Sequence, residues 1–171
     1  MPTGLKQSSS LIVIGARVDD TLAPGTFAQG AIDLQLNPLD NEVFVVQAVD
    51  IDCAPPDALA GVDTSVSASV TTTSQTALAS LSSTNTIARK ELAIRASGFV
   101  DGGVGFETAS METPPGNLDY VAIIATNDFF VQLKSTNNTQ PRSATVKMYG
   151  YRATASSSIY AALVQSELLS S

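Results

Sequence analysis

The chain has 171 residues, of which 44% are hydrophobic, 15% charged and 6% aromatic. Charged residues make up about 25% of ordinary globular proteins, and here serine and threonine supply much of the missing polarity. This composition predicts one compact domain and excludes a disordered chain. The longest early apolar run, Leu11 to Ile14, is too short for a membrane span or for a secretory signal, which need roughly 18 and about 7–15 apolar residues. We therefore expect no membrane insertion and a product made in the cytoplasm without a signal peptide.

Charge is distributed unevenly along the chain. Sixteen acids and nine bases give a formal net charge of −7, and nine of the acids fall within residues 1–63, where Lys6 and Arg17 are the only bases. Neutralising nucleic-acid phosphates requires clustered lysine and arginine. The first ten residues carry a single lysine, so they do not form a basic arm. We expect no direct binding of nucleic acid.

The residue types needed for common catalytic chemistry are missing. The chain contains no histidine and one cysteine, Cys53, which excludes a histidine-assisted nucleophile and the usual zinc ligand patterns. Cys53 ends an apolar run, and we interpret it as a buried thiol with no reactive role. The sequence therefore predicts that the protein is not an enzyme and that it uses no cofactor.

Apolar residues recur with a period of two, and turn residues recur about every 8–12 residues, which is typical of an all-β sandwich or barrel. From Phe27 to Leu36, for example, apolar positions alternate with Asp33 and Gln35. The run from Val43 to Cys53 is rich in β-branched residues and ends where Pro55 and Pro56 interrupt the ladder. The predicted strands are 11–18, 27–36, 43–53, 64–73, 76–82, 90–99, 104–110, 118–125, 129–134 and 144–152.

Several pairings follow from the turns between these strands. We expect strands 64–73 and 76–82 to pair. Asp101-Gly102-Gly103 predicts a tight hairpin turn into 104–110, and segment 111–117, with Pro114 and Pro115, predicts a turn at one end of the fold. Strands 129–134 and 144–152 are expected to form a closing hairpin.

The period changes at the end of the chain. Ile159 to Leu169 contains good helix formers without glycine or proline, and the serines at 156–158 offer N-cap hydroxyls, which predicts a short helix. The apolar side chains that would form its contact face are Ile159, Tyr160, Leu163, Val164 and Leu168. This face can pack on the same chain or on a neighbouring subunit. We expect three parts: a flexible arm (1–10), a sandwich (11–155) and the terminal helix (156–171).

Two groups of residues are candidates for ligand binding. Asp50 and Asp52 lie on the same side of one strand, and together with Asp57 and Asp63 they offer the oxygen ligands that Ca²⁺ prefers. The alternative is ordinary surface charge. Tyr149 and Tyr151 share one strand face and form a candidate ligand patch, although tyrosine pairs are also common in packing and at interfaces.

The combination of many short antiparallel strands, long connections rich in proline, glycine and serine (54–63 and 111–117), strands 129–134 and 144–152, and a terminal helix resembles the single jelly-roll coat proteins of icosahedral viruses. The resemblance implies a single-domain antiparallel jelly-roll β-sandwich of eight to ten strands, in two four-stranded sheets. It also implies a capsid subunit whose partners are copies of itself and other structural proteins of the particle, located in the virion. Many such proteins carry a basic arm, and this chain does not.

Two alternative functions remain open on sequence alone. One is a lectin-like β-sandwich, in which the tyrosine pair and the four aspartates bind a sugar with Ca²⁺. The other is a subunit of a surface filament, which is disfavoured because no export signal is recognised.

Overall fold

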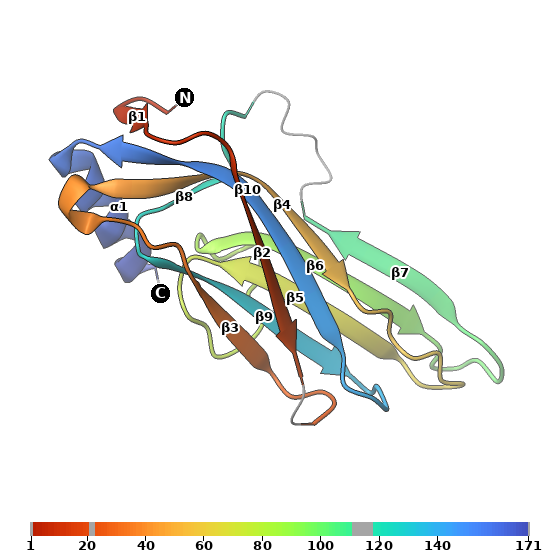
Figure 1. Cartoon of the computed structure of the whole chain (residues 1–171). Helices are drawn as coiled ribbons and strands as arrows, with labels where there is room; N and C mark the ends of the chain where they lie inside the picture. The colour runs from red at the N-terminus through yellow and green to blue at the C-terminus, as the bar shows by residue number, and fades with distance from the viewer. Residues whose placement is uncertain (1, 21–22, 111–117, 171) are drawn as a thin grey trace.

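A computed structural model describes residues 2–20, 23–110 and 118–170. Within these residues the chain forms ten β-strands, a short 3-10 turn (Pro38–Asp40) and one α-helix. Figure 1 shows how these elements are arranged. The strands are β1 (Leu5–Gln7), β2 (Ile12–Asp19), β3 (Ala28–Asp33), β4 (Glu42–Cys53), β5 (Thr64–Thr71), β6 (Thr86–Arg95), β7 (Val104–Ala109), β8 (Ala122–Ile124), β9 (Asp128–Thr136) and β10 (Ser143–Ala155). The helix is α1 (Ser157–Leu169). The predicted all-β class and the terminal helix are confirmed.

The strands form two antiparallel sheets packed face to face. Sheet A has the order β1-β10-β4-β8, and β2 pairs with β10 on the same edge as β1. Sheet B has the order β3-β9-β5-β6-β7. The described residues therefore give five strands in each sheet, one more per sheet than the coat-protein resemblance implied.

The pairing pattern defines a jelly roll. The second strand pairs with the tenth, the third with the ninth, the fourth with the eighth and the fifth with the sixth, so the pairs are nested within one another along the chain. Successive pairs alternate between sheet A and sheet B, which is how a long hairpin winds into two Greek keys. This confirms the predicted jelly-roll sandwich. Strand β7 is an addition to the nested set and lies at the outer edge of sheet B (Figure 1).

The core lies between the two sheets. Alternate residues of each strand point inward, so the apolar positions that the sequence places at a period of two meet across the sandwich. The largest fully buried apolar side chains here are Phe44, Ile124, Phe129, Leu133 and Met148. Cys53 is also buried in this core, as predicted.

The ladder between β10 and β4 is interrupted by a β-bulge. The register of β10 against β4 shifts between Tyr149 and Gly150, which leaves Gln47 without a direct partner. A side chain at position 150 would collide with the main-chain oxygen of Val45 and with the ring of Phe44. Glycine is therefore required at Gly150 by the close approach of two strands.

The predicted strand 76–82 is wrong. Strand β5 pairs with β6 instead, and segment 72–85 lies as a loop over the outer face of sheet B. Gln132 anchors this arrangement from β9: it accepts a hydrogen bond from Ser69 at 2.8 Å and donates to Thr71 at 2.6 Å and to Gln29 at 3.0 Å. The main-chain N–H of Ala79 in turn donates to the Ser69 hydroxyl. A row of hydroxyl and amide groups thus holds the loop in place.

The predicted closing hairpin is also wrong. Strand β9 belongs to sheet B and β10 to sheet A, so their connection crosses from one sheet to the other. Asp20 stabilises this crossing. Its carboxylate is buried and accepts hydrogen bonds from the Ser135 hydroxyl at 2.6 Å and from the main-chain N–H groups of Gly25 and Arg142.

Three other expectations are revised or fall outside the structure. The connection between β6 and β7 spans residues 96–103, so it is a loop and not a tight hairpin, although Gly102 has the expected positive φ of 81°. Part of the predicted N-terminal arm forms β1, which pairs with β10. The turn expected at 111–117 lies outside the described residues.

Candidate interaction surfaces

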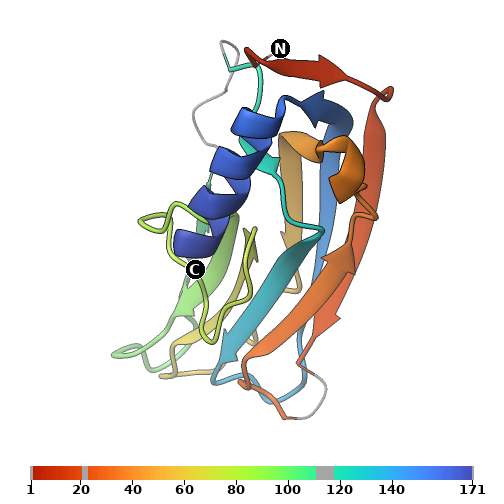
Figure 2. The ribbon, with the colours of Figure 1, turned by 90° about the vertical axis from the view of Figure 1, so that its left-hand side faces the viewer.

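Helix α1 covers one end of the sandwich, as Figure 2 shows. Four of its five predicted contact residues (Ile159, Tyr160, Leu163 and Val164) pack against apolar side chains on the outward face of sheet A. The covered residues include Val43, Val45 and Tyr151, the last only 6% exposed. The fifth predicted contact residue, Leu168, is 60% exposed. The helix therefore packs on its own chain, and contact with a neighbouring subunit stays a prediction.

Glu167 holds this helix on the sandwich, a role that the sequence pattern does not predict. Its side chain is 7% exposed, and its two oxygens accept hydrogen bonds from the main-chain N–H groups of Ala125 and Thr126. At the helix C-terminus, the side-chain amide of Asn85 donates to the carbonyl of Ser170. These contacts tie α1 to the end of β8 and to the start of β6. A lone glutamate among apolar helical residues was the one sequence signal for them.

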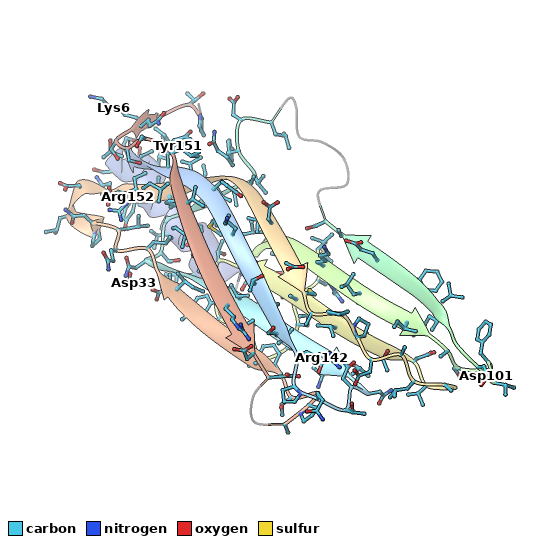
Figure 3. The ribbon with its side chains drawn as sticks, turned by 45° about the vertical axis from the view of Figure 1, so that its right-hand side comes forward. Lys6, Asp33, Asp101, Arg142, Tyr151 and Arg152 are labelled. Atoms are coloured by element: carbon cyan, nitrogen blue, oxygen red, sulfur yellow. The ribbon has the colours of Figure 1, made fainter. Side chains whose placement is uncertain are left out.

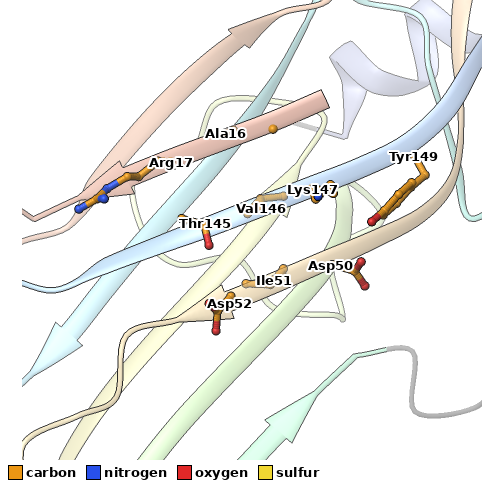
Figure 4. A pocket seen from close by; sticks show the side chains of 10 residues that line it. Ala16, Arg17, Asp50, Ile51, Asp52, Thr145, Val146, Lys147 and Tyr149 are labelled. Carbon is orange, nitrogen blue, oxygen red and sulfur yellow. The ribbon is translucent and has the colours of Figure 1, made fainter. Parts of the chain in front are cut away.

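The outward face of sheet A carries a shallow groove of about 610 Å³ beyond the part covered by α1 (Figure 4). Gly15 on β2 and Asp50 on β4 flank Lys147 on β10 in the same cross-strand row. Gly15 has no side chain, and nothing else fills the space above it. The groove is therefore hollow over Lys147 and is bounded by Tyr149, Arg17 and Asp52.

The polar groups of this groove are partly engaged with one another. Partial burial, together with a hydrogen bond to Asp50, raises the pKa of Tyr149. The guanidinium of Arg17 binds the carboxylate of Asp19 with a closest distance of 2.9 Å. The groove thus offers carboxylate, ammonium and phenol groups on a half-exposed sheet surface.

The candidate tyrosine patch is divided by the structure. Tyr149 lines the groove, whereas Tyr151 is buried beneath α1 (Figure 3 labels Tyr151). The two side chains point to the same face of β10, as predicted, but the helix covers only one of them. Only Tyr149 is available to a ligand, so a patch made of both tyrosines is not formed.

The four candidate calcium ligands are not brought together. Asp50 and Asp52 share the exposed outer face of β4. Asp57 binds Arg142 and Thr139, and Asp63 accepts hydrogen bonds from the N–H groups of Ala96 and Ser97. Within residues 2–20, 23–110 and 118–170, no three acidic, histidine or cysteine side chains gather closely enough to hold a metal ion.

Exposed apolar side chains occupy β7 and the loop that leads into it from β6. Phe99 and Val100 lie in the connecting loop, and Val104 and Phe106 lie on β7, with exposed fractions from 47% to 89%. Asp101 marks the tip of this loop in Figure 3. Contiguous exposed apolar side chains mark interaction sites more often than isolated ones. The sequence pattern predicts strand 104–110 but does not indicate that its apolar residues are uncovered.

No described helix is long and apolar enough to cross a membrane. Taken together, the nested strand pairing and the covered and uncovered surfaces define a jelly-roll β-sandwich, the architecture also used by viral coat proteins, lectins and cupins. No protein-family model matches the chain, and no curated protein sequence matches it. A chain from the solved structure of Desmodium yellow mottle tymovirus is similar at 14% identity over 91% of this chain and 93% of that one, with a TM-score of 0.34. At that TM-score the fold assignment rests on the strand pairing described above.

Proposed function

We propose that the chain is a self-assembling structural subunit, a coat protein that forms the shell of a virus particle. The observation that supports the proposal is a jelly-roll sandwich with exposed apolar side chains on β7 and in the loop before it. Val100 and Phe106 are the most exposed of these side chains. Jelly rolls are a common building unit of viral shells. Subunits of a shell must bury part of their surface against copies of themselves, and apolar side chains favour that burial.

The composition agrees with this role. Only 15% of residues are charged, and charged residues are depleted at the centre of protein interfaces. In this proposal the protein is not an enzyme, resides in the virion and has copies of itself as its main partners. Because the chain offers no basic cluster, contact with the genome falls to another component of the particle.

Light scattering of the purified chain across protein and salt concentrations, followed by negative-stain imaging, tests the proposal. We expect a species much heavier than one subunit of 17.7 kDa, with closed particles or rings of subunits in the images. A strict monomer under every condition would contradict the proposal.

The groove on sheet A supports a second candidate, a lectin-like sandwich. Tyr149, Asp50 and Lys147 place an aromatic ring, hydrogen-bond acceptors and a donor around one hollow, the combination that neutral sugars need. Glycan-array binding by the monomer, measured with Ca²⁺ and with a chelator, tests it. Binding that is lost in Tyr149→Ala would favour the lectin function, and an empty array would remove it.

A further inference from the structure

Strand β7 forms an open edge of sheet B. It pairs with β6 from Lys90↔Ala109 to Arg95↔Val104 and has no strand on its other side among the described residues. Figure 1 shows it as the outermost strand, beyond the edge of sheet A. An exposed edge presents unpaired N–H and C=O groups that favour pairing with another strand.

The direction of these main-chain groups follows from one hydrogen bond. The N–H of Ser110 donates to the carbonyl of Arg89 at 2.8 Å, so residues 110 and 89 form a hydrogen-bonded pair. Hydrogen-bonded and non-hydrogen-bonded pairs alternate along an antiparallel ladder. The main-chain groups of 104, 106 and 108 therefore point to β6, and those of 105, 107 and 109 point to the open edge.

The side chains of β7 do not protect this edge. Monomeric proteins commonly place lysine, proline or a bulge on exposed edge strands, and β7, with the sequence VGFETA, has none of these. Its one charge, Glu107, is paired with Lys90 of β6 at 2.9 Å. Phe106 and Val104 lie on the outer face of sheet B and are exposed.

Strand β7 of a second copy of the chain can form hydrogen bonds with the N–H and C=O groups at this open edge. Two antiparallel registers place the outward-pointing N–H and C=O groups of β7 opposite those of its copy and keep most of the strand paired. One register is centred on Glu107 and the other on Phe106. The first sets two glutamates directly opposite each other, which is unfavourable. The second sets Glu107 opposite Gly105 of the copy, which has no side chain, and Phe106 opposite Phe106.

We propose that β7 pairs with β7 of a second copy about a twofold axis at Phe106, joining two B sheets into one continuous sheet. In this arrangement Val104 lies opposite Thr108 of the copy, and the two Phe106 rings form an aromatic pair. The contact is isologous, because the same patch serves both subunits. This inference rests on the proposed function, for which it names one subunit contact.

Cysteine cross-linking tests the register. Residues opposite each other in a non-hydrogen-bonded pair have Cα atoms about 4.5 Å apart, within the range a disulfide spans. We expect Phe106→Cys to form a disulfide-linked dimer with oxidised glutathione. Thr108→Cys is the matched control on the same strand face: the two copies of residue 108 would lie about 13 Å apart, so no dimer is expected.

A mixture of two cysteine variants tests the same register without replacing Phe106. Val104→Cys mixed with Thr108→Cys should give a cross-linked heterodimer, which neither variant gives alone. The buried Cys53 is present in every sample and does not contribute to the difference. Failure of both Phe106→Cys and the mixture to cross-link, or equal cross-linking of Thr108→Cys alone, would overturn the inference.

A proline variant tests the edge itself. The N–H of Gly105 points to the open edge, so Gly105→Pro removes a donor for the second copy and leaves the β6 ladder intact, whereas Gly105→Ala keeps the donor. Light scattering should show the dimer in Gly105→Ala and its loss in Gly105→Pro, while both variants remain folded. A dimer in both variants would contradict the edge contact.

The two proposals fail in different ways. Closed particles without the specific cross-links would reject the β7 contact and keep the coat-protein function. Specific cross-links without any particle would establish the contact and reject the shell.

Discussion

The carboxylate of Glu167 on α1 accepts a hydrogen bond of 2.7 Å from the main-chain N–H of Ala125, just beyond the end of β8. Its second oxygen accepts another, of 2.9 Å, from the N–H of Thr126. A buried charge is tolerated when hydrogen bonds replace its hydration. Because two otherwise unpaired N–H groups are satisfied at once, this one side chain fixes the position of the helix on the sandwich.

Replacing this carboxylate tests its role. We expect Glu167→Ala to lower the free energy of unfolding by about 2–3 kcal/mol, because the buried N–H of Ala125 and the partly buried N–H of Thr126 lose a charged acceptor. Glu167→Gln should cost less, since one acceptor oxygen remains. Urea denaturation measures both, with Gln165→Ala, on an exposed position of the same helix, as the control. Equal stability of the Glu167→Ala and Gln165→Ala variants would contradict the role of Glu167.

We expect the two glycines of sheet A to differ in how their replacement by alanine changes the stability of the fold. Gly150→Ala should destabilise the fold by about 1–3 kcal/mol, because its Cβ would lie 2.6 Å from an atom of the Phe44 ring. Gly15→Ala meets no atom within 4 Å and should be neutral or slightly stabilising. Thermal unfolding compares them directly, and a similar loss in both would show that crowding at 150 is not the cause.

The class of fold was predictable from sequence, whereas several pairings were not. The alternating β-branched runs of β4 and β10 identify strands because their apolar side chains must reach the core at a period of two. The serine and threonine alternation at 76–82 predicts a strand, but the segment is a loop. A loop that lies on the outer face of a sheet, here through a hydrogen bond to Ser69, which in turn binds Gln132, can show the same alternation as a strand. The turn residues between the consecutive strands β9 and β10 predict a hairpin, but local turn residues do not specify which sheet receives the next strand.

The candidate sites were harder to predict, because segments that are distant in the sequence determine which of their side chains are buried and which partners they bind. Tyr149 and Tyr151 are equivalent in the strand pattern, and only the docking of α1 separates them. Similarly, Asp57 and Asp63 lie in the same connection between β4 and β5, but Asp57 binds Arg142 whereas Asp63 accepts a hydrogen bond from the N–H of Ala96.

Acid should weaken the loop that contains Asp57. Hydrogen bonds from the N–H and hydroxyl of Thr139, and then from Arg142, lower the pKa of the Asp57 carboxyl. The pKa of an aspartate in an unfolded chain is about 3.9, so the folded state binds fewer protons than the unfolded state. The resulting stability is complete above about pH 4 and is lost as pH falls through the folded pKa.

The pH dependence of the melting temperature measures this effect. Asp57→Asn should have a flatter profile below about pH 4 than the unmodified chain. Asp101→Asn, at an exposed loop position, is the control and should keep the steep profile. Parallel profiles of Asp57→Asn and the unmodified chain would refute the prediction.

Loss of the Gln132 side chain should release segment 72–85. Gln132→Ala removes the partner of Ser69, Thr71 and Gln29 and leaves buried polar groups unsatisfied, at a cost of about 2–3 kcal/mol. We expect limited proteolysis to cut within 72–85 faster in this variant than in Gln140→Ala, whose side chain lies in an exposed position. Unchanged cleavage sites and rates would show that the loop is held by other contacts.

Cys53 should be inert in the folded protein. Burial raises the pKa of its thiol to about 11, so the reactive thiolate is scarce at neutral pH. A chromogenic disulfide reagent at pH 8 should label Cys53 only after denaturant is added. Rapid labelling of the native chain would mean that the core around β4 opens readily.

The nested pairing has a consequence for synthesis of the chain. Strand β10, which follows the other nine described strands in the sequence, lies between β2 and β4 in the middle of sheet A. Its two neighbours are completed roughly a hundred residues earlier and must wait for it, a separation of the kind that slows folding. Sheet A therefore closes only after β10 has been made, and nascent chains carry uncovered strand edges until that moment.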